Sequence, residues 1–547
     1  MTATPLSPPT SARSPLQIPA RAGVREWLAL AVLFLPTLLV AVDNTVLGFA
    51  LPAISRALRP DATTLLWIVD VYPLVLAGLL IAMGGLGDRI GRRRLLLVGI
   101  TGFGAVSLLA AFATDGSHLV AARAALGFFG AMLMPSVLAI LRTIFVDRTQ
   151  RRLALAIWAT GFAAGAALGP IVGGLLLEHF WWGAVFLVNV PVAVLVLLAA
   201  PLVLPESRMA DPGRPDLGGV ALSMLAAVPA VLAIHTVGEH GFTVASVAEL
   251  AVAGAAGALF VRRCRELPGR GRRPLIDLDL FASPVVRVSV LANATTMFAL
   301  TGLLFFAAQY LQLVLGRSPL EAGLVLVPGM VATILAGLGA AALARRFPLR
   351  ALVPAGLVLA AAGYVLCTRL GVGSAGTLLL VAAVLIGAGI GLSETITNDA
   401  ILAAAPADRA GSASAVSETA YELGAVLGTA VLGSVLSAVY QAAVQVPADA
   451  APGVALGAEA SETARQTLGG AVDVAAGMPA PAANALLGSA REAFALGVDV
   501  TAGVGTAALL LVALTVVLGL RPRRPRPRRG GRRAGPPPPG PRPAAAR

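Results

Sequence analysis

Residues 62–113 read ATTLLWIVDVYPLVLAGLLIAMGGLGDRIGRRRLLLVGITGFGAVSLLAAFA. Two apolar runs, at 62–84 and 95–113, each have about the 20 residues that a helix needs to cross a membrane. The polar segment GGLGDRIGRRR, residues 84–94, lies between them, and its glycines permit a tight turn. The stretch therefore predicts two membrane-spanning helices joined by a short basic loop.

Apolar runs of this length recur along the rest of the chain. Of its 547 residues, 57% are hydrophobic and 13% are charged, and the mean hydropathy is +0.84. A soluble globular protein has roughly 25% charged residues, so the composition excludes a soluble enzyme, a disordered protein and a fibrous protein. We therefore predict an all-α integral membrane protein with fourteen transmembrane helices. The apolar runs lie at 27–50, 62–84, 95–113, 118–142, 153–176, 183–204, 217–237, 244–262, 287–310, 319–343, 351–370, 375–397, 411–441 and 496–520.

The distribution of arginines predicts the orientation in the membrane. Residues 521–547 hold ten of the 41 basic residues and no acid, and they account for most of the net charge of +13. A basic tail beside a last membrane helix is typical of the cytoplasmic side, where it faces anionic lipids, so we expect membrane lipids and no nucleic acid as its partner. The other arginines gather in alternate short loops, which predicts a multi-pass membrane protein with both termini cytoplasmic. These loops contain Arg89 and Arg92–Arg94, Arg148–Arg152, Arg262–Arg273 and Arg345–Arg350.

Three charged residues interrupt the first, second and fourth apolar runs. Inserting Asp43, Asp70 or Arg123 at the centre of a membrane would in each case cost about 2.5–3.5 kcal/mol of free energy. We therefore expect each of them to have a structural or functional role. Helix rise places all three in the outer half of the membrane. Two carboxylates near one guanidinium form a candidate proton-coupling group, in which Asp70 is also a candidate for binding a cationic substrate. The alternative is a fixed salt bridge that holds helices together.

Two further acids lie in the thirteenth run. Glu418 and Glu422 are four residues apart and therefore share one face of a helix. Two carboxylates that face one cavity would bind a cationic ligand or protons, so both are candidate substrate-binding residues. The alternative for Glu418 is hydration near the cytoplasmic helix end, and we expect solvation for Glu394 and Asp399.

The loop at residues 84–94 is a candidate gate. Gly84 and Gly91 permit a tight turn, while Asp88 can form a charge lock with Arg89 or Arg92 that breaks when domains rock. The alternative is an ordinary basic loop on the cytoplasmic side.

The fifth apolar run carries a periodic glycine motif. Gly165, Gly169 and Gly173 are four residues apart and align on one helix face, which permits close packing of a neighbouring helix. Gly174 follows them, and Pro170 is expected to kink the helix. The alternative is a generic packing motif of membrane helices.

Patterns typical of enzymes and ATP-driven pumps are missing from the sequence. His118, His179, His235 and His240 all lie at or near predicted external helix ends and are not spaced as a metal cluster. The sequence contains no phosphate-binding loop, no nucleophile elbow and no dinucleotide fingerprint. We therefore expect no catalytic residues, no metal and no cofactor, and an ion gradient as the energy source.

Together these motifs resemble the major facilitator superfamily, and within it the fourteen-helix drug:proton antiporter family. Residues 65–70 and 417–424 are similar to multidrug efflux pumps of the QacA and LfrA type. The resemblance covers about residues 25–520. Its other motifs are Val42–Val46 with Ala50–Pro52 in the first helix, residues 84–94, Arg123 with Gly127, and Gly165–Gly174.

This resemblance implies two six-helix bundles with two additional central helices. It also implies alternating-access export of lipophilic cations, such as dyes, quaternary ammonium compounds and some fluoroquinolones, in exchange for protons by a monomer. Asp43 and Arg123 match positions tied to proton coupling, and Asp88 and Arg92 match the gating loop. The acids that match positions for coupling or cation recognition are Asp70, Glu418 and Glu422.

The chain departs from the pattern of this family in three places. Leu126 stands where relatives often have Gln, and Ser417 stands where QacA-type pumps carry another acid. Some relatives have a carboxylate in the tenth helix, but residues 322–345 contain no acid. Fewer acids favour monovalent over divalent cations as substrates.

The resemblance and the two tails divide the chain into five expected parts. The parts are an N-terminal tail (1–26), a six-helix bundle (27–204), two inserted helices with flanking loops (205–286), a second six-helix bundle (287–520) with an external loop (442–495), and a basic tail (521–547).

Three alternatives to multidrug efflux stay open. They are a dedicated exporter of one endogenous metabolite or antibiotic, a polytopic membrane enzyme, and a sensor that has lost transport. The intramembrane acids are dispersed at mid-depth, which disfavours the enzyme.

Overall fold

The computed structural model describes residues 22–208, 216–272, 274–404, 410–447, 449–451 and 454–520. Most of the expected N-terminal tail and the whole basic C-terminal tail lie outside the described residues. The described chain is almost entirely helical, which confirms the all-α prediction. Its elements are α1 (Val24–Leu58), α2 (Ala62–Ile90), α3 (Arg92–Ala111), α4 (Gly116–Ile144), α5 (Arg148–His179), α6 (Ala184–Leu187), α7 (Asn189–Val203), α8 (Leu217–His240), α9 (Val244–Glu266), the 3₁₀-helices η1 (Pro268–Arg270) and η2 (Leu278–Ala282), α10 (Pro284–Gln309), the π-helix η3 (Tyr310–Val314), α11 (Pro319–Leu343), α12 (Leu349–Cys367), α13 (Gly376–Ala404), α14 (Ala410–Leu427), the π-helix η5 (Gly428–Gly433), α15 (Ser434–Ala443), the strands β1 (Asp449–Ala451) and β2 (Val454–Ala455), α16 (Ala458–Gln466), α17 (Leu468–Ala476) and α18 (Ala480–Gly519).

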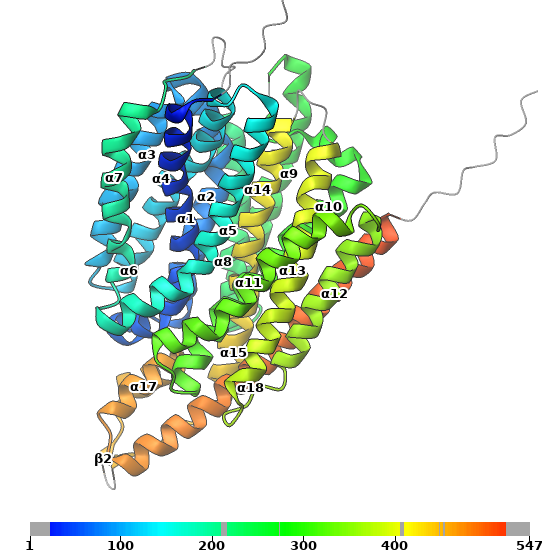
Figure 1. The fold of residues 1–547 in the computed structure, drawn as a ribbon. Helices are drawn as coiled ribbons and strands as arrows, with labels where there is room; N and C mark the ends of the chain where they lie inside the picture. Colours follow the sequence, from blue (N-terminus) through cyan, green and yellow to red (C-terminus); the bar gives the residue numbers. More distant parts are fainter. Residues whose placement is uncertain are drawn as a thin grey trace, which may run out of the picture.

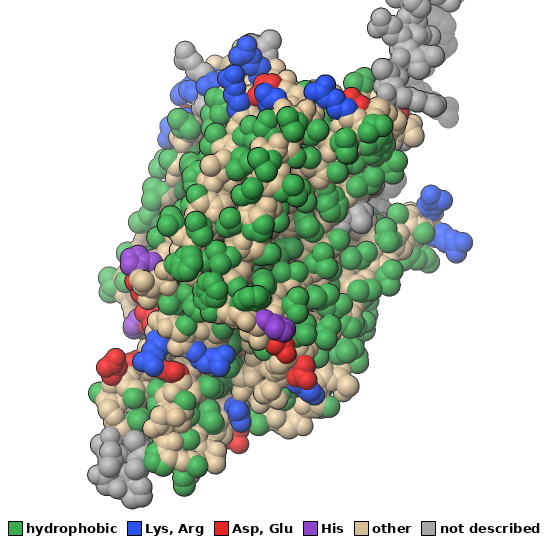
Figure 2. All heavy atoms as spheres, turned by 60° about the vertical axis from the view of Figure 1, so that its left-hand side comes forward, with side chains coloured by type: hydrophobic (Ala, Val, Ile, Leu, Met, Phe, Trp, Pro, Cys, Tyr) green, Lys and Arg blue, Asp and Glu red, His purple; other side chains and the backbone are tan. Residues whose placement is uncertain are grey.

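The number of long apolar helices fits the predicted number of membrane crossings. Thirteen helical segments of the described chain have the length and apolar composition to cross a membrane. Helix α5 fits as a further crossing, since it runs over 32 residues and has an apolar part at Ala164–His179. The surface in Figure 2 is apolar through its middle, and its charged side chains gather mostly toward the two ends. The chain is therefore a multi-pass membrane protein.

The segment between α15 and α18 is more ordered than the sequence predicts. We expected a loop over 442–495, but it contains the antiparallel pair β1–β2, the helices α16 and α17, and the first part of α18. Helix α18 has 40 residues and a length of about 60 Å, whereas the hydrocarbon core of a membrane is about 30 Å thick. Its first turns therefore extend beyond the membrane, beside α17 (Figure 1).

Helix packing divides the transmembrane part into an N-terminal half, α1–α7, and a C-terminal half, α10–α18. One apolar core lies wholly within residues 29–204, and another is built mainly from residues 288–516. Helices α8 and α9 pack against each other, and α8 also contacts α2 of one half and α15 of the other. The inserted helix α8 therefore touches both halves.

The glycines of α5 bring this helix close to α1. A Cβ atom at Gly165 would lie 2.8 Å from the Cβ of Ala41, and one at Gly173 would lie 2.9 Å from Val46. Gly174 faces a different helix, since its Cβ would lie 2.7 Å from Leu320 in α11. The glycine face thus joins α5 to α1, and the following residue joins α5 to the C-terminal half.

The two halves are joined at the end of the bundle that carries α16 and α17, called here the hairpin end. At this end the hydroxyl groups of Ser55 and Thr467 share a hydrogen bond of 3.1 Å. Arg59 and Asp473 form an ion pair, with 2.6 Å between Nη2 and Oδ2. Apolar contacts reinforce the junction, because residues of α1 and α2 belong to the core of the C-terminal half. These residues are Phe49, Leu51, Leu65 and Leu66.

Gly165→Leu is expected to destabilise the protein, because the added side chain would enter the contact with Ala41. Overpacking of this kind costs about 1–3 kcal/mol. Thermal denaturation of the purified protein in detergent measures the loss. Gly254→Leu on α9 is the matched control, since Gly254 is exposed and a Cβ there meets nothing within 4 Å. Equal denaturation temperatures for both variants would contradict the assigned role of the glycine face.

Candidate functional site

A buried ion pair joins α1 to α4. Arg123 Nη1 lies 2.7 Å from Asp43 Oδ2, and the two side chains are only 2% and 1% exposed. Asp43 Oδ1 also accepts a hydrogen bond of 3.0 Å from Asn189 at the start of α7, and Asn189 in turn donates to Ser107 at 3.2 Å. Both carboxylate oxygens are therefore bound, which offsets part of the cost of burying a charge in a low dielectric.

The guanidinium of Arg123 is held by two further contacts from α2. Its Nε donates a hydrogen bond of 3.1 Å to the carbonyl oxygen of Ile68. Its Cζ lies 4.4 Å from the centre of the Tyr72 ring, which is a cation–π geometry. Sequence reasoning found Asp43 and Arg123 but missed Asn189 and Tyr72, because neither has a pattern that separates it from ordinary helix residues.

Asp70 does not join this ion pair as the sequence predicts, but pairs with the inserted helix α8 instead. His235 Nε2 lies 3.1 Å from Asp70 Oδ2, and both side chains are fully enclosed. The Trp67 ring packs edge-on against the imidazole, with ring centres 5.2 Å apart. His235 lies near the end of α8, as expected, but its burial and its contact with Asp70 were not predicted. The sequence holds no local signal for this contact, because it joins two helices that are far apart in the chain.

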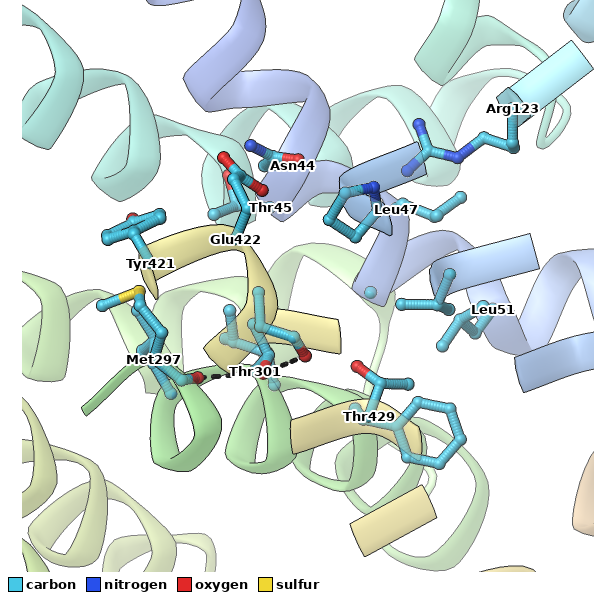
Figure 3. A pocket seen from close by; sticks show the side chains of 17 residues that line it. Asn44, Thr45, Leu47, Leu51, Arg123, Met297, Thr301, Tyr421, Glu422 and Thr429 are labelled. Carbon is cyan, nitrogen blue, oxygen red and sulfur yellow. Dashed lines mark hydrogen bonds between the residues drawn. The ribbon is translucent and has the colours of Figure 1, made fainter. Parts of the chain in front are cut away.

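A cavity lies between the two halves at the level of these charges. About 740 Å³ of space free of atoms lies within it, including its open part. Arg123 of α4 and Glu422 of α14 both line it, so its basic and its acidic side chain come from different halves (Figure 3). The remaining lining residues are Asn44, Thr45, Leu47, Gly48, Leu51, Val69, Pro73, Met297, Leu300, Thr301, Leu304, Phe305, Tyr421, Ala425 and Thr429.

The hydroxyl group of Thr301 joins two helices of the C-terminal half that line the cavity. It donates to the carbonyl oxygens of Met297, at 2.9 Å, and Ala425, at 3.0 Å, and so fixes α10 against α14. Met297 and Tyr421 supply polarizable surface on this side, as Figure 3 shows. The lining thus combines a broad apolar surface with a few polar groups, which is typical of small-molecule sites.

The two glutamates of α14 have different positions. Glu422 is buried and lines the cavity, whereas Glu418 is half-buried and lies one turn nearer the arginine-rich end, the end opposite to the hairpin end. Glu394 of α13 is also half-buried and close enough to Glu418 for electrostatic interaction, so the expectation of simple solvation understates its burial. Asp399 is exposed, as expected.

The expected loop over residues 84–94 is almost entirely helical, since only Gly91 lies between α2 and α3. The junction of these two helices forms a hydrogen-bond network at the arginine-rich end. Asp88 Oδ1 accepts hydrogen bonds of 3.0 and 2.8 Å from Arg92, whose Nη1 donates to Thr143 at 3.0 Å. Gly91 has φ 112°, a conformation that favours glycine, and its backbone approaches Glu206 beyond α7. Asp88, Arg92 and Thr143 belong to the N-terminal half, and Glu206 directly follows it. Arg89 also makes an interaction.

No group of three or more metal-binding side chains occurs among the described residues. Cys264 and Cys367 are both free.

Comparison with known proteins identifies the family. A family profile described as "Major Facilitator Superfamily" matches residues 33–429. This chain belongs to the major facilitator superfamily. It is 50% identical over 504 residues to the multidrug efflux pump LfrA of Mycolicibacterium smegmatis, covering 92% of this chain and 98% of that protein. It is 37% identical over 494 residues to the methyl viologen resistance protein SmvA of Salmonella typhimurium, covering 90% and 97%.

A solved structure supports the major facilitator fold. The bacterial homologue of the human lysosomal transporter Spinster, in an inward-facing and unoccupied conformation, aligns with a TM-score of 0.60 and 17% identity. The alignment covers 91% of this chain and 99% of that structure. Together with the family match and the efflux-pump relatives, this fold identifies the chain as a transporter and not an enzyme, as predicted.

Removing either partner of the Asp43–Arg123 pair should destabilise the protein strongly, because the other charge stays buried without its partner. Arg123→Leu and Asp43→Leu are each expected to cost about 3–5 kcal/mol. The double variant should lose less than the sum of the two, and thermal denaturation of all three in detergent measures this coupling. Arg317→Leu is the control, because its 3.8 Å pair with Glu321 is exposed. Strictly additive losses would show that the pair is not coupled.

Proposed function

We propose that this protein is a proton-coupled multidrug efflux transporter of a bacterial plasma membrane, which exports lipophilic cations in exchange for protons. The observation that carries the proposal is one cavity, between the two halves, lined by both Arg123 and Glu422. Asp43 lies directly behind Arg123 and binds it. A substrate site and a titratable buried pair are therefore in contact. The 50% identity to a multidrug efflux pump supports the same function.

Glu422 supplies the recognition of cations. Its carboxylate is the acid among the residues that line the cavity, and the surrounding surface is mainly apolar. A lipophilic cation can place its charge near Glu422 and its rings against Met297, Phe305 and Tyr421, which contact it without directional hydrogen bonds. Such a site accepts dyes and quaternary ammonium compounds of different shapes.

Asp43 and Arg123 supply the coupling to protons. While Asp43 is charged, it neutralises the guanidinium of Arg123, and the cavity can accept a cation. When Asp43 takes up a proton, the positive charge of Arg123 in the cavity wall is no longer compensated. A bound cation is then repelled and leaves. The proton and the cation therefore compete although they bind at different places, the proton on Asp43 and the cation in the cavity. Export of a cation is in this way exchanged for uptake of a proton.

Alternating access supplies the movement. We assign the arginine-rich end to the cytoplasm, because positive charge is retained there, and the hairpin end to the exterior. The contacts of Ser55 and Arg59 with α17 and its preceding residue then close the exterior. The network of Asp88 and Arg92 lies at the cytoplasmic end and moves with the N-terminal half when the cavity opens to that side. One copy of the chain carries out the whole cycle.

Ethidium efflux tests this proposal directly. In a host that lacks its own pumps, the protein should export ethidium, and a proton uncoupler should stop the export. Asp43→Asn removes the titratable charge and is expected to abolish pH-driven efflux. Full activity in this variant would contradict its role. No efflux from the folded wild-type protein would instead favour a dedicated exporter of one endogenous compound.

Glu422→Gln is expected to weaken binding of ethidium by about tenfold, because an uncharged amide replaces the carboxylate in the cavity. Fluorescence titration of the purified protein measures the affinity. Glu418→Gln is the matched comparison on the same helix face, one turn outside the lining residues, and should have a smaller effect. Equal affinities in the wild-type protein and Glu422→Gln would exclude Glu422 as the cation-binding residue.

A further inference from the structure

The contact between Asp70 and His235 is the most unusual polar interaction outside the Asp43–Arg123 network. Their side chains are 0% exposed and meet at 3.1 Å, in an apolar cluster that includes Leu74, Val231 and Ala430. Asp70 Oδ1 and His235 Nδ1 have no hydrogen-bond partner, although both are buried. Each such group costs about 1–3 kcal/mol, so a purely structural role leaves this arrangement unexplained.

Helix α8 connects the pair to the hairpin end on one side, and Thr429 connects it to the cavity on the other. His235 and Glu239 are one turn apart on the same face of α8, and Thr63 of α2 donates a hydrogen bond to Glu239. Glu239 is 24% exposed and lies at the hairpin end, whereas His235 is enclosed. On the other side, Thr429 faces Asp70 and also lines the cavity. The stripe from Glu239 through His235 to Asp70 therefore leads from the exposed end of the helix toward the cavity.

The other charged and titratable groups of the neighbouring elements are more remote from the pair. Glu249 of α9 contacts Thr236 at 3.5 Å, on the residue beside His235. Glu422 lies on α14, two turns before Thr429. Arg123 contacts α2 through the carbonyl oxygen of Ile68 and pairs with Asp43. In α15, the packing partner of α8 is the uncharged Ser434, opposite Gly238.

We propose that the inserted helix α8 takes part in proton coupling, with His235 carrying protons between the hairpin end and Asp70. The inference rests on the proposed function, since it assigns a route to the protons of that exchange. It also gives one of the two additional helices a role, since α8 supplies a proton-carrying residue.

The transfer conserves charge and needs no other reactant. A hydronium ion at the hairpin end gives a proton to His235 at Nδ1 and leaves water, while the proton on Nε2 passes to Asp70 Oδ2. Rotation of the imidazole ring before the next transfer brings the protonated nitrogen back to Asp70. Neutral Asp70 and neutral imidazole remain. When Asp70 releases its proton toward the cavity, the pair holds one negative charge, which a cationic substrate in the cavity stabilises. Substrate entry thereby favours proton release.

The test compares two transport modes of His235→Gln in proteoliposomes. Gln keeps a side-chain donor near Asp70 but cannot carry a proton. Efflux of ethidium driven by a pH gradient is expected to fall at least about tenfold and to lose its dependence on external pH. Exchange of labelled for unlabelled ethidium, which needs no net proton transfer, should stay within about twofold of the wild-type rate. His118→Gln is the control, since His118 is exposed and paired with Asp115.

The outcomes separate this inference from the proposed function. If efflux by the wild-type protein is insensitive to the pH gradient, the proposed function itself is wrong. If the wild-type protein is sensitive and His235→Gln keeps the same pH profile, only the role of His235 is overturned. A parallel loss of both transport modes would show a structural role and would also overturn it. Should His235→Gln not fold, Asp70→Asn tests the same pair, and gradient-driven efflux retained in that variant would contradict the inference.

Discussion

The cost of placing charge in a membrane governs the organisation of this protein. Asp43 and Arg123 would each be expensive alone, but together they form a 2.7 Å ion pair whose remaining groups are bound by Asn189, Ile68 and Tyr72. The pair requires α1, α2, α4 and α7 to meet at one point. The glycines of α5 then allow that helix to approach α1 beside it, and the N-terminal half is arranged around the pair.

The cavity follows from the same constraint. Arg123 binds Asp43 and also lines the cavity. In the proposed mechanism, a change of charge on Asp43 therefore acts on a ligand through Arg123, without direct contact. Glu422 enters from the other half of the molecule. Because the two charged walls belong to different halves, rearrangement of the halves changes the distance between the charges. In the proposed mechanism, recognition, coupling and movement are therefore parts of one electrostatic arrangement.

The junction at the hairpin end shows how the extramembrane segment contributes. Helices α16 and α17 belong to the C-terminal half, and Tyr440 of α15 binds the carbonyl oxygen of Ala464 at 2.9 Å. The same segment contacts α1 through Ser55 and Arg59. Together with the apolar contacts of Phe49 and Leu66, it joins the two halves at this end.

The sequence by itself determined the all-α membrane fold and the residues whose burial would be costly, because hydropathy and the cost of a buried charge are properties of each segment alone. Asp43, Arg123 and Glu422 were found in this way, and the loop and glycine motifs indicated the family. The partner of each charge was decided only by the tertiary structure, because pairing depends on which helices are neighbours. For this reason Asp70 was expected near Arg123 but pairs with His235, and the segment before α18 was expected to be a loop but folds against both halves.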